Sequence, residues 1–154
     1  MAAAGNWQCG EKVFKFLLDQ RGEQFTTTED IIKAAASNQV QGRDILELLL
    51  DRRAEQFTIT EDVIKTAASN PSRGWDILVL LLDRREEQFT ITEDIVQAAV
   101  GNEGWGGEKV LKLLIDRRGE QIMVTDEIIK AAEGNKSNSK WMLSLLKERG
   151  KIQG

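Results

Sequence analysis

Apolar residues recur along the chain in two alternating helical patterns. Within residues 60–70, apolar side chains lie at positions i, i+1, i+4 and i+5 and form a single stripe, made by Val63, Ile64, Ala67 and Ala68. Such a stripe is typical of an amphipathic helix whose small residues let a neighbouring helix approach closely. Residues 77–82 are apolar without interruption, which predicts a second helix that is buried nearly all round. Together the two patterns predict a helical hairpin over residues 60–85.

Polar residues mark the ends of both predicted helices. Thr60 is a favourable N-cap, and Glu61 and Asp62 place negative charge beside the positive end of the helix dipole. Asn70 is expected to end the first helix, because asparagine tolerates the left-handed conformation that a C-terminal cap requires. Two arginines follow Asp83 at the end of the second helix, where they interact favourably with the negative end of its dipole.

The hairpin pattern is repeated at a nearly constant spacing. Intervals of 32, 32 and 33 residues separate the threonines that start the copies, Thr28, Thr60, Thr92 and Thr125. This is the length of one two-helix unit with its connector. We therefore predict a mainly α fold, an ankyrin-like α-solenoid of tandem helix-turn-helix repeats that forms a single array over residues 1–154. Its parts are a partial first unit at 2–27 and hairpins at 28–53, 60–85, 92–118 and 125–149.

Short segments with strand-like alternation link the hairpins. In the segment before Thr60, Phe57 and Ile59 alternate with threonines, a pattern too short to predict a sheet. We expect extended connectors in which one bulky apolar residue packs beneath the next unit, namely Phe25, Phe57, Phe89 and Ile122. Because short helices are marginal alone, each unit is expected to depend on its neighbours.

The two ends of the sequence do not coincide with complete hairpins. Residues 2–6 have the pattern of the last part of a first helix, and a second helix without its partner is predicted from Gly10 to Arg21. We interpret the array as a piece of a longer one. The alternative is an end that associates with another chain, end to end.

Variation between the copies is concentrated in the turn between the two helices. Residues 34–65 and 66–97 match at 22 positions, and four of the ten differences lie at residues 71, 72, 73 and 75. All four tryptophans lie in or near these turns, and tryptophan is enriched in interface hot spots. The candidate partner-binding residues are therefore Trp7, Gln39, Gln41, Pro71, Arg73, Trp75, Glu103, Trp105, Lys136 and Trp141. The alternative is that each tryptophan folds back and covers the start of its helix.

Two polar residue types recur once per unit. An asparagine follows each first helix, which predicts a cap and a bonded ladder along the array, formed by Asn6, Asn38, Asn70, Asn102 and Asn135. An arginine follows each second helix, namely Arg21, Arg53, Arg85, Arg118 and Arg149. Aspartates stand beside them at Asp19, Asp51, Asp83 and Asp116. This predicts exposed pairs between repeats worth about 0 to 1 kcal/mol each, and a phosphate-binding stripe is the alternative.

The composition offers few groups that could perform chemistry. The chain of 154 residues contains no histidine and no tyrosine, so the usual general base and the commonest metal ligand are absent. Cys9 has no histidine to activate it, and the pair Glu61 and Asp62 lies at a helix start where the dipole explains it. We therefore expect no enzyme, no catalytic residue, no cofactor and no metal site.

Charge and cysteine content bear on partners and compartment. The formal net charge is −4 and the acidic and basic residues are interspersed, so a nucleic-acid partner is not favoured. A lone cysteine cannot form an internal disulfide, and the first residues lack the regions of a signal peptide. No apolar stretch approaches the roughly 20 residues needed to span a bilayer. We expect a cytoplasmic protein in a reducing compartment, without membrane contact.

Several short runs carry a resemblance to a known group of repeats. The run at 2–6, the runs at 49–53 and 81–85, and the runs at 58–62 and 90–94 resemble helical repeats appended to filamentous-fungal NLR-type (STAND ATPase) and ankyrin-like proteins. The resemblance implies a recognition array of a larger intracellular receptor, without catalytic residues. Its function would be to bind a protein or to sense a ligand. Glu61 and Asp62 stand where ankyrin repeats have a proline and a histidine.

A second resemblance supplies the alternative function. The helix at 60–70, with its Ser-Asn ending, is similar to the first helix of transcription-activator-like effector repeats, which implies a DNA-binding array. By this resemblance Asn38 and Asn70 would brace the turn, and bases would be faced by Gln39 and Pro71 and, in looser copies, by Trp7, Glu103 and Lys136. The chain departs from that pattern because no Gly-Gly follows the reading residue.

Overall fold

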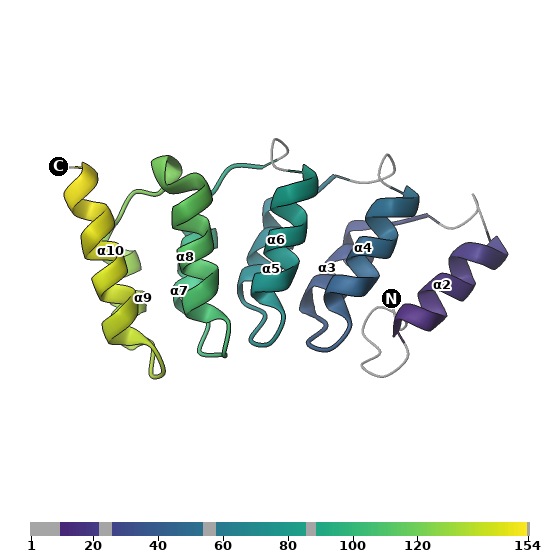
Figure 1. Ribbon diagram of the computed structural model, residues 1–154, viewed down its shortest axis with the longest axis horizontal. Coiled ribbons are helices and arrows are strands. Elements are labelled where there is room, and N and C mark those ends of the chain that lie inside the picture. Colours follow the sequence, from purple (N-terminus) through teal and green to yellow (C-terminus); the bar gives the residue numbers. More distant parts are fainter. Residues whose placement is uncertain (1–9, 22–25, 54–57, 86–88, 154) are drawn as a thin grey trace.

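The computed structural model describes residues 10–21, 26–53, 58–85 and 89–153, and these form a row of helical hairpins (Figure 1). The helices are α2 (Gly10–Arg21), α3 (Glu29–Ser37), α4 (Gly42–Arg53), α5 (Glu61–Ala68), α6 (Gly74–Arg85), α7 (Glu93–Val100), α8 (Gly107–Arg118), the 3₁₀ helix η4 (Gly119–Gln121), α9 (Asp126–Gly134) and α10 (Ser139–Gln153). Within the described ranges there is no β-strand. The mainly α solenoid predicted from the repeats is confirmed.

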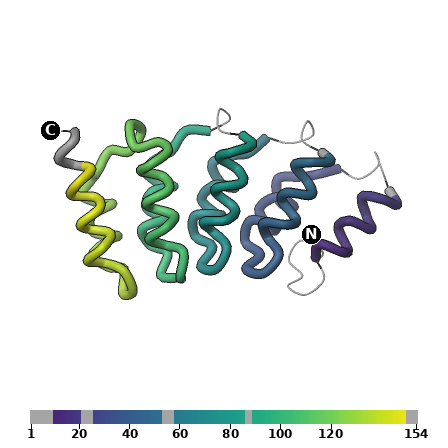
Figure 2. Tube along the Cα trace, in the orientation of Figure 1, coloured from purple at the N-terminus to yellow at the C-terminus, as the bar shows by residue number. Residues whose placement is uncertain are grey.

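The helices form two layers that run the length of the array (Figures 1 and 2). One layer contains the first helices of the hairpins, in which α3 contacts α5, α5 contacts α7 and α7 contacts α9. In the other layer α2, α4, α6, α8 and α10 contact one another in that order. The turns within hairpins lie along one long edge, which we call the turn edge (residues 38–41, 70–73, 101–106 and 135–138). The described parts of the connectors lie along the opposite edge.

Small residues bring the two layers close together. Ala35, Ala67, Ala99 and Ala132 are fully buried on the first helices. A Cβ added to Gly74 would lie 2.6 Å from the carbonyl oxygen of Ala67, and one added to Gly42 would lie 2.6 Å from that of Ala35. Glycine at the start of the second helix is therefore required by the close approach of the two helices of one hairpin.

The second helices supply most of the core. In α6, Ile77, Leu78, Leu81 and Leu82 are fully buried. Val79 is partly exposed and Leu80 is 6% exposed, so the predicted burial nearly all round is confirmed. Burial of this run against two neighbouring second helices provides the hydrophobic stabilisation that a short isolated helix lacks.

The threonines at the helix starts have a role beyond capping. Thr60 occupies the N-cap position with extended backbone, yet its hydroxyl makes no capping hydrogen bond. The hydroxyl of Thr60 donates instead to Oε1 of Glu29 in the preceding repeat, at 2.7 Å. Thr92 and Thr125 do both, because each accepts a bond from its own helix and donates to a glutamate one repeat earlier.

Each connector ends in extended backbone, as predicted, since Thr28, Thr60, Thr92 and Thr125 all have extended angles. Ile122 is 1% exposed with backbone angles of −92° and 112°, and Phe89 is partly buried against the core. Phe25 and Phe57 lie outside the described residues, so the predicted row is confirmed only at Phe89 and Ile122. In the last connector the chain first makes the 3₁₀ turn η4, which the pattern did not predict.

The helix predicted from Gly10 to Arg21 is present as α2. The helical tail predicted at residues 2–6 lies outside the described residues, as does Cys9. At the other end α10 continues to Gln153, past Arg149 where the predicted hairpin ends.

Candidate interaction surface

A ladder of buried asparagines holds the turn edge in place. The side-chain amide of Asn70 donates to the carbonyl oxygens of Ala36 and Asn38 in the preceding repeat, at 2.9 and 3.2 Å. Asn102 and Asn135 make the corresponding bonds to the repeats before them. Because these side chains are at most 5% exposed, the ladder fixes the spacing of successive turns.

The same asparagines also shape the turns themselves. Oδ1 of Asn70 accepts the backbone N–H groups of Ser72 and Arg73 at 3.1 and 2.9 Å. Such Asx bonds give the backbone N–H groups of a turn a hydrogen-bond acceptor that they would otherwise lack. The predicted ladder is confirmed at Asn70, Asn102 and Asn135, whereas Asn6 lies outside the described residues. The predicted cap is confirmed at Asn38 and Asn135, but the C-cap residues of α5 and α7 are Ser69 and Gly101.

The predicted conformation of the cap is wrong. Asn38 and Asn135 have φ of −70° and −71° with ψ of 118° and 114°, which is extended backbone and not left-handed. The extended conformation is favoured because it directs the side chain both into its own turn and toward the preceding repeat.

Exposed hydrophobic side chains lie on the turn edge that this ladder supports and, for Trp75 and Trp141, on the first turns of α6 and α10 beside it. Trp105 is 95% exposed, Trp75 41% and Trp141 37%, and Val40 in the first described turn is 47% exposed. Trp105 therefore does not fold back onto its helix, and Trp75 and Trp141 are covered only in part. Trp7 lies outside the described residues. Fully burying a large apolar side chain is worth about 1.5–3 kcal/mol, so the exposed rings leave surface that a partner can cover.

The polar candidates from the sequence are distributed over the same edge, with different local bonds. Gln39 and Lys136 are exposed. Arg73 forms an ion pair with Asp76 at 3.0 Å. Gln41 is partly buried, and its side-chain oxygen accepts the backbone N–H of Glu11 at 3.2 Å, so it also supports the junction with α2.

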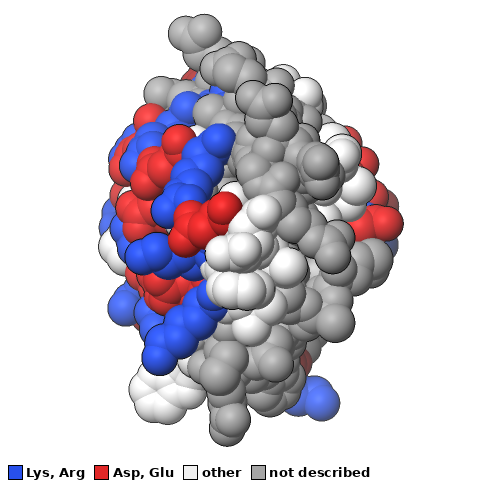
Figure 3. All heavy atoms as spheres, turned by 90° about the vertical axis from the view of Figure 1, so that its right-hand side faces the viewer, with Lys and Arg blue, Asp and Glu red and all other residues white. Residues whose placement is uncertain are grey.

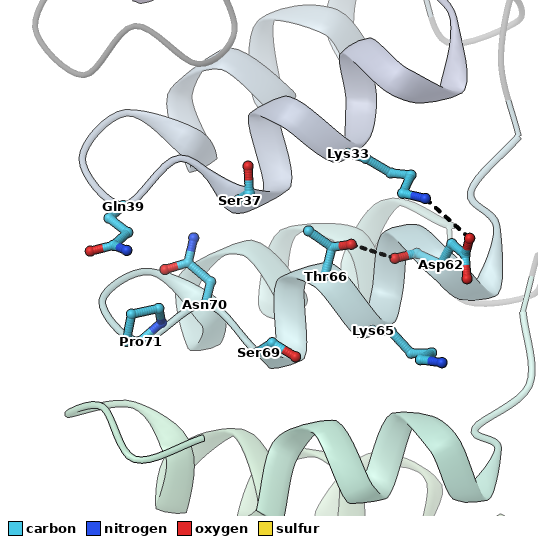
Figure 4. A pocket seen from close by; sticks show the side chains of 9 residues that line it. All are labelled: Lys33, Ser37, Gln39, Asp62, Lys65, Thr66, Ser69, Asn70 and Pro71. Carbon is cyan, nitrogen blue, oxygen red and sulfur yellow. Dashed lines mark hydrogen bonds and ion pairs between the residues drawn. The ribbon is translucent and has the colours of Figure 1, made fainter. Parts of the chain in front are cut away.

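A groove connects the turn edge to the layer of first helices (Figure 4). It has a volume of about 480 Å³ between α3 and α5. Gln39 and Pro71 line its turn end, and Lys33, Asp62 and Lys65 line the other end. The structure thus brings two sequence-predicted residues together with helix residues that the sequence comparison did not single out.

Charges inside this groove are paired with the next repeat. Nζ of Lys33 lies 3.1 Å from Oδ2 of Asp62, and Nζ of Lys65 lies 2.7 Å from Oδ2 of Asp94. The hydrogen bond from Lys33 to Asp62 raises the pKa of Lys33, and the one to Asp94 raises the pKa of Lys65. Both lysines are protonated at neutral pH, but a paired aspartate offsets the charge of each. The groove is therefore not a strongly cationic site.

A row of pairs between repeats also crosses the second helices, but with other arginines than predicted. Asp19 pairs with Arg52, and Asp51 with Arg84 at 2.8 Å. Asp83 pairs with Arg117 at 2.8 Å. The first arginine of each Arg-Arg pair makes the contact, because helical spacing places it on the face toward the preceding repeat.

The last positions of the predicted arginine row depart from this arrangement. Asp116 pairs with Lys112 on its own helix at 2.8 Å, and Nε of Arg149 donates to the carbonyl oxygen of Gly119 at 2.8 Å. The arginine side chains at positions 21 and 53 lie outside the described residues. Acidic groups beside the paired arginines offset the charge that a phosphate stripe would require.

Opposite charges are mixed over the surface seen from the end of α2. Acidic and basic side chains lie side by side on one flank of that view (Figure 3). In the described part of the chain, no group of three or more acidic, cysteine or histidine residues is placed to hold a metal ion. The described helices include none that is both long enough and apolar enough to cross a membrane.

Several surface residues were missed by the sequence comparison. Val40 differs between the copies and could have been chosen by the same criterion as its neighbours. Glu108 and Lys140 lie on the first turns of α8 and α10, outside the variable turn, and each lines a surface groove together with a nearby tryptophan, Trp105 or Trp141.

The fold and its repeated polar contacts define a tandem array of helical repeats. A family model described as "Domain of unknown function (DUF7104)" matches five successive segments of the chain, at residues 1–13, 16–45, 48–77, 80–110 and 113–142. The chain belongs to this family. No curated protein and no solved structure shows a significant match.

Proposed function

We propose that the chain is a non-catalytic scaffold that binds a segment of another protein along its turn edge. The observation that carries the proposal is the row of exposed hydrophobic side chains on this edge, of which Trp105 is 95% exposed. Exposed aromatic side chains on a rigid support are the usual anchors of protein interfaces.

The support for these side chains is rigid in a way that suits recognition. The turns that follow α5, α7 and α9 are each braced by an asparagine whose amide is bonded to the preceding repeat, such as Asn102 to Asn70 at 3.0 Å. Pre-ordered turns lower the entropy lost on binding. The turn sequence itself varies between repeats while the frame is constant, so different turns would contact different parts of one partner.

Two finer parts of the proposal rest on resemblance. The likeness of residues 49–53 and 58–62 to repeats of fungal NLR-type receptors supports a role as the recognition array of a larger intracellular receptor. DNA recognition is not favoured, because the candidate reading positions include Glu103, whose charge repels phosphate.

Selection from a random peptide-display library tests the proposal. Binders selected on the wild-type chain should fail to bind a Trp75→Ala/Trp105→Ala/Trp141→Ala variant. The matched control is Met123→Ala, which removes a hydrophobic side chain that is 74% exposed on the connector edge, and binding should be kept there. Peptides that bind the triple variant as well as the wild type would contradict the proposal.

A binding titration with a labelled DNA duplex tests the alternative function. Titration at low and at physiological salt should give no binding. Binding that weakens steeply with salt would replace the peptide-binding proposal with nucleic-acid recognition.

A further inference from the structure

Two adjoining grooves on the turn edge carry opposite charge. The first, of about 280 Å³, is lined by Glu103, Trp105 and Glu108 and, from the next turn, by Ser137 and Asn138. The second, of about 460 Å³, is lined by Lys136, Lys140 and Trp141 and contains the same Ser137 and Asn138. An acidic groove and a basic groove, each with a tryptophan, therefore share one wall.

The charges in these grooves differ from the other charges of the turn edge. At the earlier turns, Arg43 pairs with Glu47 at 2.9 Å and Arg73 with Asp76 at 3.0 Å. In the described part of the chain, none of the four groove charges forms an ion pair; these are Glu103, Glu108, Lys136 and Lys140. Among these four residues, the structure gives one hydrogen bond between the acidic pair and the basic pair. It is a long one, from the backbone N–H of Lys136 to Oε1 of Glu103 at 3.4 Å.

We propose that the two grooves bind a peptide segment that carries a basic side chain close to an acidic one. This deepens the proposed function, on which it rests. The basic side chain lies over Trp105 between Glu103 and Glu108, where cation–π attraction and charge act together. The acidic side chain contacts Lys136 and Lys140 beside Trp141. Ser137 and Asn138, between the grooves, provide polar groups for the peptide backbone.

Complementary charge argues for this occupant over a uniformly charged one. A polyanion would be repelled by the first groove, and a polycation by the second. A purely apolar segment would leave four charges beside it without partners, which costs free energy where water is excluded. Only a segment with both charges satisfies both grooves.

NMR titration of the ¹⁵N-labelled full chain tests the assignment. The probe is a blocked six-residue peptide with one arginine and one aspartate two positions apart, added at low ionic strength. We expect saturable shifts of the Trp105 and Trp141 indole N–H signals. Glu103→Gln/Glu108→Gln should weaken binding about fivefold, and the peptide with glutamine in place of arginine should bind wild type and this variant equally.

The basic groove has its own variant. Lys136→Gln/Lys140→Gln should weaken the original peptide about fivefold and leave the peptide with asparagine in place of aspartate unaffected. Arg43→Gln, at an earlier turn, is the matched control and should bind like wild type.

The outcomes separate this inference from the broader proposal. Binding that is lost in Trp105→Ala but is the same for charged and neutral peptides would overturn the charge assignment and leave the binding edge intact. Equal shifts in wild type and in both charge variants would overturn it as well. If no peptide perturbs either indole signal, and library selection also yields no edge-dependent binder, both proposals fail.

Discussion

The side-chain amide of Asn102 donates a hydrogen bond to the backbone carbonyl oxygen of Asn70, at 3.0 Å, across the boundary between two repeats. Asn70 makes the same contact with Asn38 at 3.2 Å. One side chain thus closes its own turn and joins that turn to the one before it. Buried polar groups are stabilising only when all their bonds are made, and the repetition of the same geometry in each unit achieves this.

Removing one member of the ladder should destabilise the array strongly. Asn70→Ala leaves the carbonyls of Ala36 and Asn38 and two turn N–H groups without their partner. We expect a loss on the order of 3 kcal/mol in the free energy of unfolding, measured by urea denaturation. Ser69→Ala, an exposed neighbour, is the control and should change little. A loss below about 0.5 kcal/mol for Asn70→Ala would show that the ladder is not stabilising.

The core of the second helices should be equally sensitive. Leu81 is fully buried, so Leu81→Ala should lower the free energy of unfolding by about 2–5 kcal/mol. Val79→Ala, in the same helix at a partly exposed position, should cost less. The same denaturation experiment measures both, and similar small losses would contradict the burial of α6.

Two glycines should respond to alanine with opposite signs. At Gly74 the new Cβ would lie 2.6 Å from the carbonyl oxygen of Ala67, so Gly74→Ala should cost about 1–3 kcal/mol. At Gly134, in α9, a Cβ meets nothing within 4 Å, so Gly134→Ala should stabilise by about 0.5–1 kcal/mol through helix propensity. Thermal unfolding followed by circular dichroism resolves both shifts. Stabilisation at Gly74 would mean that α5 and α6 are not in close contact there.

The row of lysine–aspartate pairs between the first helices stops at Gln97, and a substitution there should continue it. Lys33 and Lys65 each pair with an aspartate of the next repeat, whereas the equivalent Gln97 bonds to Glu93 on its own helix at 3.2 Å. Gln97→Lys places a cation opposite Glu127, at the position equivalent to Asp94. We expect a stabilisation of about 0.2–1 kcal/mol at low salt that declines at high salt.

Gln97→Met controls for side-chain length in this experiment. The comparison of interest is the salt dependence of the unfolding midpoint in the two variants. If Gln97→Lys and Gln97→Met respond identically to salt, the row of pairs does not continue to α9.

The layer architecture could be predicted because it depends on local patterns. The stripe of Val63 and Ile64 and the apolar run that contains Leu81 each fix how one helix packs, and the repeat spacing places the helices in order. The sequence also indicated that Asn70 would belong to a bonded ladder, because an asparagine recurs once per unit after each first helix.

The finer contacts could not be predicted, because they depend on how one repeat is rotated against the next. The direction of Arg84 toward Asp51, instead of Arg85, follows from the faces of α4 and α6 that meet. The extended backbone of Asn135 follows from carbonyl positions one repeat away, since its amide donates to Val100 and Asn102. Likewise, only the packing of successive repeats brings Ser137 and Asn138 of the fourth turn to the groove that Trp105 and Glu108 line.

The central claim is that the turn tryptophans bind a partner and contribute little to packing. Urea unfolding of the Trp75→Ala/Trp105→Ala variant, beside wild type, tests this most directly. We expect the free energy of unfolding to stay within about 1 kcal/mol of wild type, since Trp105 is 95% exposed and Trp75 41%. A loss of several kcal/mol would show that the rings are part of the packed structure, and the proposed binding edge would then be wrong.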